Sequence, residues 1–321
     1  MSFSKEIKKE IMSNDLSSKE QALAFLCGLN FSSAEYLLND KKIEGYKITT
    51  DFEELKDYIQ TLLAYVYGDN QAKVEILPAF NIGRTPYFYI TLDNATALKL
   101  LTDIFAIETL GGKYQKTNQI DDRLLETIDG LKGFVSGVFM GSGTSSIKLD
   151  TSRKTTGYHL EISNTSYELL HEISVALAQF DILAKLTKRK NMYVLYIKDA
   201  EEVSNMLALM GASNAVLTLQ NEIITRQMRN KINRQNNCYV SNFSKTLNAS
   251  FNQLEAIRLI DETYGISSLS ADLQEVALLR LANTEESLEE LLKLTKTPLT
   301  KSALNHKFQK LIKMANKIKG N

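Results

Sequence analysis

Hydrophobic positions in the first two thirds of the chain follow two periods, one of three to four residues and one of two. The longer period predicts amphipathic helices, and the shorter one predicts half-buried strands. A first series of helix, strand, helix, two strands and helix covers 18–38, 46–50, 52–66, 74–80, 87–93 and 95–107. A second series of similar order covers 131–139, 146–150, 158–163, 166–180, 184–188, 192–198 and 200–210. The repeat predicts an α+β domain of two αββ-type units related by a pseudo-twofold axis.

The remainder of the chain carries helical periodicity alone, with three helices expected within 253–319. We therefore divide the 321 residues into a pseudo-twofold domain over 1–212, a basic and mostly helical connector over 213–252, and an all-α domain over 253–321. Residues 284–293 and the stretch from Thr300 onward form two helices separated by a break at 295–298, which is typical of a helix-turn-helix.

Composition narrows the class of protein. Hydrophobic residues make up 44% and charged residues 24%, as in ordinary soluble globular proteins. Cys27 and Cys238 stand far apart, so the sequence offers neither a disulfide framework nor a zinc-ligand spacing. No stretch is long and apolar enough to span a membrane. A cytoplasmic protein without cofactor or metal is expected.

The charges of the chain are unevenly distributed. The formal net charge is zero, but 291–321 contains no Asp or Glu and eight lysines. The last helix places Leu304, Phe308, Leu311, Ile312 and Ala315 on one stripe and polar residues on the other side. Such a face can read base edges and contact phosphates, which favours DNA binding over a merely solvated helix. The expected contacts are Lys296, Thr300, Lys301, Ser302, Asn305, His306, Lys307, Gln309, Lys310 and Lys313.

The connector has a second polar stripe. Arg229 and Asn233 lie four residues apart on one helix face, and Asn230 and Arg234 lie on the neighbouring face. These side chains can donate hydrogen bonds to phosphates, or they can pin the two domains against each other. Both interpretations stay open at this point.

Two glycine-containing stretches occupy corresponding places in the two αββ units. Segments 26–34 and 135–143 resemble the paired LAGLIDADG helices of homing endonucleases, which bind divalent metals through an acidic residue at each helix end. Here those acid positions are Ser33 and Ser142, and a hydroxyl cannot neutralise a hard cation. The resemblance therefore implies a LAGLIDADG-like domain without nuclease activity. As an alternative interpretation, the glycines serve only the close packing of two ordinary helices.

Three segments together resemble the WhiA family of sporulation regulators. They are the degenerate glycine helices, 229–234 with Asn237, Cys238 and Asn242, and the run 298–307. After Cys238 this chain has Tyr239, Val240 and Ser241, where the family usually has Asp, Thr and Ala. The resemblance implies a transcription factor linked to cell division and chromosome segregation, also in species that do not sporulate.

The expected partner is double-stranded DNA, bound by a monomeric, nucleoid-associated protein in the cytoplasm. Two other functions remain as alternatives. One is an active homing endonuclease or maturase-like enzyme, which the missing acids disfavour. The other is an interaction scaffold whose first domain recruits another transcription regulator or RNA polymerase.

Overall fold

The computed structural model describes residues 2–68, 73–79, 87–117, 120–147 and 157–320. Within it the chain divides into two compact units, 1–225 and 226–321. Residues 80 and 148–150, which belong to two of the expected strands, lie outside the described residues.

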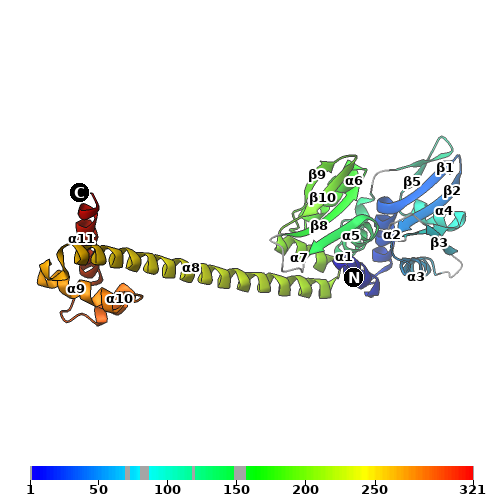
Figure 1. Cartoon of the computed structure of the whole chain (residues 1–321). Helices are drawn as coiled ribbons and strands as arrows, with labels where there is room; N and C mark the ends of the chain where they lie inside the picture. The colour runs from blue at the N-terminus through cyan, green and yellow to red at the C-terminus, as the bar shows by residue number, and fades with distance from the viewer. Residues whose placement is uncertain (1, 69–72, 80–86, 118–119, 148–156, 321) are drawn as a thin grey trace. The chain divides into compact units, whose positions relative to one another are not determined.

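The first unit contains two four-stranded antiparallel sheets and the helices that cover them (Figure 1). Its helices are α1 (Phe3–Ser13), α2 (Lys19–Ser33), α3 (Leu55–Tyr67), α4 (Asn94–Asp103), α5 (Ile128–Ser142), α6 (Tyr167–Ala178) and α7 (Ala200–Leu209), with the 3-10 turn η1 (Asp122–Leu124). The first sheet, in the order β1-β2-β4-β3, is formed by β1 (Ala34–Asn39), β2 (Lys42–Thr50), β3 (Val74–Ala79) and β4 (Tyr87–Leu92). The second, in the order β7-β8-β10-β9, is formed by β7 (Gly143–Ile147), β8 (Tyr158–Asn164), β9 (Lys185–Arg189) and β10 (Met192–Ile197).

The registers of the two sheets correspond at the residues that directly follow the two central helices. Ala34, directly after α2, pairs with Ile48, and Gly143, directly after α5, pairs with Ile162. Ile48 then pairs with Ile90, and Ile162 pairs with Leu195. Each of these four apolar side chains is buried, because it faces the helical side of its sheet. The predicted pseudo-twofold α+β fold is thereby confirmed.

Helices α2 and α5 lie side by side at the centre of this unit (Figure 1). A β-carbon on Gly28 would stand 2.1 Å from the carbonyl oxygen of Phe134, and one on Gly137 would stand 2.0 Å from that of Phe25. No side chain fits at such distances, so each helix meets the backbone of the other through its glycine. The core of the unit is built around this contact.

The expected helix over 18–38 is wrong in its last residues. Helix α2 ends at Ser33, and β1 begins at Ala34. The strand forms because β2 supplies its hydrogen-bond partners from a distant part of the chain, and a local periodicity does not register such partners. Helix α1 and the hairpin β5 (Ile107–Leu110) with β6 (Lys113–Lys116) also had no counterpart among the expected elements.

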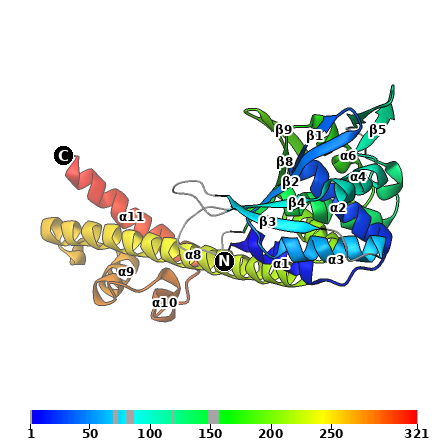
Figure 2. The same cartoon turned by 90° about the vertical axis from the view of Figure 1, so that its right-hand side faces the viewer.

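Helix α8 (Ser213–Tyr264) crosses the division between the units, so the connector is part of one continuous 52-residue helix. In the second unit the C-terminal part of α8 is surrounded by further helices (Figures 1 and 2). These are the 3-10 turn η2 (Ile266–Ser268), α9 (Ala271–Ala282), α10 (Leu288–Lys293) and α11 (Lys301–Lys319). A separate apolar core holds them, with Ile257, Val276, Leu291 and Phe308 all at most 1% exposed.

Candidate nucleic-acid interface

Helix α11 begins and packs as its sequence dictates. The hydroxyl of Thr300 accepts a hydrogen bond from the backbone N–H of Ala303 at 3.1 Å, which caps the first turn. Leu304, Phe308 and Leu311 are fully buried against α9, α10 and α8. This burial fixes the rotation of α11 and therefore determines which side chains point outward.

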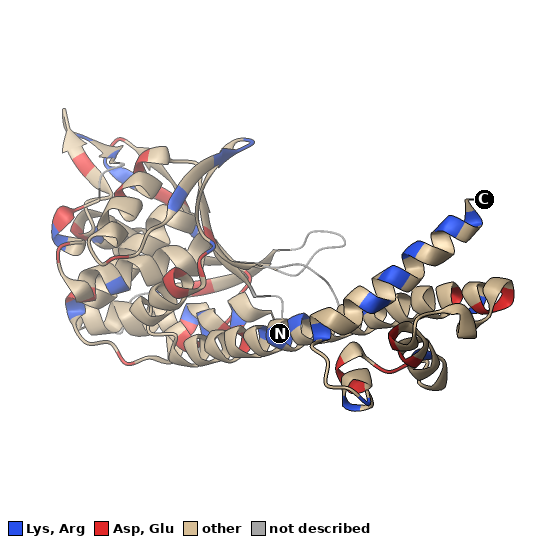
Figure 3. Ribbon diagram, turned by 90° about the vertical axis from the view of Figure 1, so that its left-hand side faces the viewer, with Lys and Arg blue, Asp and Glu red and all other residues tan. Residues whose placement is uncertain are grey.

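The outward face of α11 carries most of the predicted DNA contacts. In Figure 3 the helix that ends at the C-terminus has blue bands and no red ones, whereas red bands lie on α9 and α10. Its 100° steps place Ser302, Asn305, Gln309 and Lys313 on one stripe, opposite the buried residues. The exposed members of the predicted set are Lys296, Thr300, Lys301, Ser302, Asn305, His306, Gln309, Lys310 and Lys313.

Two of the predicted lysines are held by acids of the same unit. The ammonium of Lys301 lies 2.7 Å from the carboxylate of Glu289 on α10. That of Lys307 lies 2.8 Å from Asp272 on α9, and its side chain is only 19% exposed. By contrast, no described carboxylate forms an ion pair with Lys310 or Lys313. These two lysines therefore present their full charge to solvent.

The two helices before α11 form its scaffold. Helix α10 starts with a capping box, in which Ser287 accepts a hydrogen bond from the N–H of Glu290 and the Glu290 side chain accepts one from the N–H of Ser287. The backbone N–H of Lys296, in the turn before α11, donates to the carboxylate of Glu275 on α9. The turn between α10 and α11 is thereby tied to α9.

The predicted connector contacts lie on α8, and all are exposed: Arg229, Asn230, Asn233 and Arg234. The opposite side of this stretch carries two exposed apolar residues, Met228 and Ile232, which are 62% and 54% exposed, together with Lys231 and Gln235. No hydrogen bond or ion pair to described residues holds the four polar side chains. The structure thus leaves them available for phosphates within the described part of the helix.

At the glycine helices, the serines in the two acid positions are engaged locally. The hydroxyl of Ser33 donates to the carbonyl oxygen of Leu29 at 3.0 Å, and that of Ser142 donates to the carbonyl oxygen of Val138 at 3.4 Å. Both hydroxyls therefore bond back into their own helices. Among the described residues, no group of three or more His, Cys, Asp or Glu could hold a metal ion.

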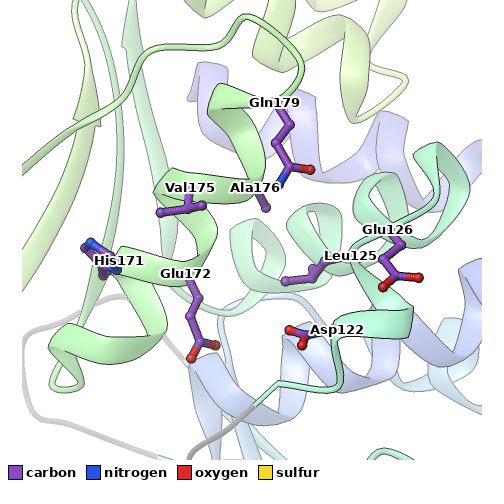
Figure 4. A pocket seen from close by; sticks show the side chains of 8 residues that line it. All are labelled: Asp122, Leu125, Glu126, His171, Glu172, Val175, Ala176 and Gln179. Carbon is purple, nitrogen blue, oxygen red and sulfur yellow. The ribbon is translucent and has the colours of Figure 1, made fainter.

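A cavity of about 430 Å³ lies between η1 and α6 in the first unit (Figure 4). The carboxyl groups of Asp122, Glu126 and Glu172 line it, together with His171. Burial raises the pKa of Glu172, and the nearby carboxylate of Asp122 raises it further. Such a concentration of negative charge makes this part of the first unit unsuitable for a polyanion.

Two family models match the chain: one described as the WhiA LAGLIDADG-like domain over residues 131–229, and one described as the WhiA C-terminal HTH domain over 232–315. A probable cell division protein WhiA from Clostridium perfringens strain SM101 is 33% identical over 320 residues, with 99% of each chain covered. The chain belongs to the WhiA family.

The WhiA assignment holds over the full length of the chain. A probable cell division protein WhiA from Clostridium acetobutylicum is 31% identical over 99% of both sequences. The crystal structure of full-length DUF199/WhiA from Thermatoga maritima has a TM-score of 0.58 and 25% identity, with 99% of each chain covered. The sequence resemblance is confirmed, and so is the pairing of a LAGLIDADG-like domain with a helix-turn-helix domain.

One buried residue of the WhiA helix-turn-helix was absent from the sequence interpretation. Arg280 on α9 is only 2% exposed. The signal was present, because Arg280 continues the spacing of Leu273, Val276 and Ala277 along the apolar face of α9. A charged residue on a buried stripe requires an explanation, which the apolar periodicity alone does not provide.

The ion pair between α9 and α11 predicts a pH effect. Its Lys307 partner is the main cause that lowers the pKa of Asp272 from 3.8 to about 2. The pair therefore stabilises the folded unit fully above about pH 4 and ceases to do so as the pH falls toward 2. We expect Asp272→Asn to lower the melting temperature at pH 7, with the difference from the parent vanishing near pH 2.

Circular dichroism melts across this pH range measure the effect. Glu262→Gln, an exposed acid on α8 with no ion pair to a described residue, is the matched control and should follow the parent at every pH. A constant difference for Asp272→Asn down to pH 2 would show that the charge pair is not its cause.

Within the described residues, no helix is both long and apolar enough to cross a membrane.

Proposed function

We propose that the chain is a sequence-specific, DNA-binding transcription regulator that places α11 in a major groove and breaks no bond. The single observation that carries this is the orientation of α11. Its acid-free side, with Asn305, Gln309, Lys310 and Lys313, faces solvent, while its apolar stripe is buried. Amide side chains can pair with adenine edges, and lysines can reach guanine or phosphate.

The arrangement of the second unit supports this proposal. Helix α11 follows α10 after a short turn, which is the order in which a helix-turn-helix presents its recognition helix. The exposed connector residues Arg229 and Arg234 supply additional cations for the DNA backbone. Relatives named as probable cell division proteins support a role for the regulated genes in cell division, and we include chromosome segregation in the same proposal.

Selection of bound duplexes from a random pool, with the full-length chain, tests the proposal. We expect a defined site to emerge, and its affinity should fall linearly on logarithmic axes as salt is raised. Equal affinity for selected and scrambled duplexes would contradict sequence-specific binding. The non-enzymatic part of the proposal has its own test: supercoiled plasmid incubated with the chain and Mg²⁺ or Mn²⁺ should remain supercoiled, and cutting would refute it.

A further inference from the structure

A cavity of about 540 Å³ lies within the second unit, between α8 and the first turns of α10 and α11. Three basic side chains line it: Lys245 from α8, Arg280 from α9 and Lys301 from α11. Glu289 is the acid among the lining residues, and it is already paired with Lys301 at 2.7 Å. The cavity therefore has an excess of positive charge, in contrast to the acidic cavity of the first unit.

Arg280 forms the floor of this cavity and is held in one position. Its Nε donates to the side-chain oxygen of Gln253 at 2.9 Å, and its Nη1 donates to the carbonyl oxygens of Asn283 and Glu286 at 3.1 and 2.8 Å. All three acceptors are neutral. The second terminal nitrogen, Nη2, donates no hydrogen bond to any described residue.

Arg280 joins α9 to α8 and to the loop before α10, and its guanidinium lies over the Phe308 ring at 5.3 Å, but these contacts leave Nη2 without an acceptor. A guanidinium that is 2% exposed loses most of its hydration, and no carboxylate of the described residues forms an ion pair with it. An apolar side chain of similar size would fill the space beneath Phe308 without that cost. Fixing the charge with neutral acceptors while one nitrogen stays free is the arrangement that prepares a guanidinium for an oxyanion.

The second cation is free to take part. Lys245 is exposed, and it forms no ion pair with a described acid. Its ammonium can therefore bind an anion in the cavity without breaking an existing contact. Lys301 is paired with Glu289, so the two together add no net charge to the cavity, and the excess positive charge comes from Arg280 and Lys245.

We propose that this cavity is a phosphate-binding pocket in which Arg280 and Lys245 hold one phosphate group. The inference rests on the proposed function, because the nearest source is a backbone phosphate of the duplex that α11 reads. A phosphate at the first turn of α11 would fix the register of the helix in the groove. A free phosphate compound presents the same chemistry, and the experiment distinguishes the two sources.

Duplexes that carry a single uncharged methylphosphonate linkage, moved along the selected site, test the DNA source. With the full-length chain we expect one linkage per site to lower affinity about tenfold, the effect of losing a charge-assisted hydrogen bond. In Arg280→Gln and in Lys245→Gln, affinity for the normal duplex should already be lower. The same methylphosphonate should then have no further effect. Lys245 is exposed, so its variant keeps the test valid if Arg280→Gln fails to fold.

Lys319→Gln is the matched control. It removes one charge from the other end of α11, about 27 Å along the axis from Lys301, where Lys319 pairs with Glu255. This variant should keep the full tenfold sensitivity to the methylphosphonate. Arg280→Lys retains the charge but loses the paired nitrogens of the guanidinium, so it should keep part of the sensitivity to the methylphosphonate.

A second arm tests whether a free phosphate compound binds the pocket. The melting temperature is measured with inorganic phosphate in place of chloride at equal ionic strength. An increase in melting temperature that is lost in Arg280→Gln and Lys245→Gln, with normal methylphosphonate sensitivity in both, would assign the pocket to a free phosphate compound. Unchanged behaviour of both variants in both arms would overturn the pocket. If the parent chain shows no sequence discrimination at all, the proposed function has failed, and the inorganic phosphate arm alone then decides the pocket.

Discussion

Replacing both Asn305 and Gln309 with alanine lowers the affinity of the full-length chain for its selected duplex at least about thirty-fold. Both amides are exposed on the stripe of α11 that lies opposite its buried residues. Each can form two hydrogen bonds with an adenine edge, and such a pair contributes roughly 1–3 kcal/mol to discrimination. Affinity for a scrambled duplex should hardly change, because phosphate contacts remain.

For the exposed lysines of α11 we expect the opposite pattern, an equal loss of affinity for both duplexes. Lys310→Gln with Lys313→Gln should weaken binding to selected and scrambled duplexes alike, and it should reduce the salt slope by about two. Fluorescence anisotropy titrations at several salt concentrations measure both quantities. Identical effects of the amide and lysine variants on the two duplexes would show that α11 does not read sequence.

Gly137→Leu should destabilise the first unit by roughly 3 kcal/mol or more, which is the upper range for overpacking a core. The reason lies in the contact between α2 and α5. The first added carbon would stand 2.0 Å from the carbonyl oxygen of Phe25 and 2.9 Å from the backbone nitrogen of Leu29. Backbone atoms cannot rotate away, so the two helices would have to separate. Urea unfolding followed by circular dichroism measures the loss.

Gly45→Asn is the control for this substitution. Gly45 has φ of +64° and no atom within 4 Å of an added β-carbon, and Asn tolerates this backbone conformation. Its cost should stay below about 1 kcal/mol, since space is not limiting there. Equal losses from the two variants would mean that the close approach of α2 and α5 is not what stabilises the unit.

The pseudo-twofold fold followed from the repeated order of apolar periods, and the family followed from short motifs along the chain. Errors occurred where structure depends on distant partners. Residues 34–39 continue the apolar spacing of the preceding helix, yet they form β1 because β2 is available to pair with them. The connector has helical spacing, but its periodicity does not reveal that it continues without interruption through Tyr264.

The candidate interface shows a similar division between local and distant information. The exposed stripe of α11 could be predicted from helical spacing, because the apolar residues that define the buried side lie on the same helix. The ion pairs of Lys301 and Lys307 could not, since Glu289 and Asp272 are 12 and 35 residues away. The position of Arg280 on the buried face of α9 could be read from the local spacing, but its acceptor Gln253, 27 residues away on α8, could not.

A DNA-cleaving iron chelate attached near the start of α11 tests the central claim most directly. The reagent is coupled to a cysteine introduced by Ser302→Cys in a Cys238→Ser background, and the remaining Cys27 is fully buried. We predict cuts clustered within the selected site when the chelate is on α11, and few cuts when it is attached through Ser267→Cys on η2. Cleavage no stronger from position 302 than from 267, with the duplex still bound, would contradict the placement of α11 in the groove.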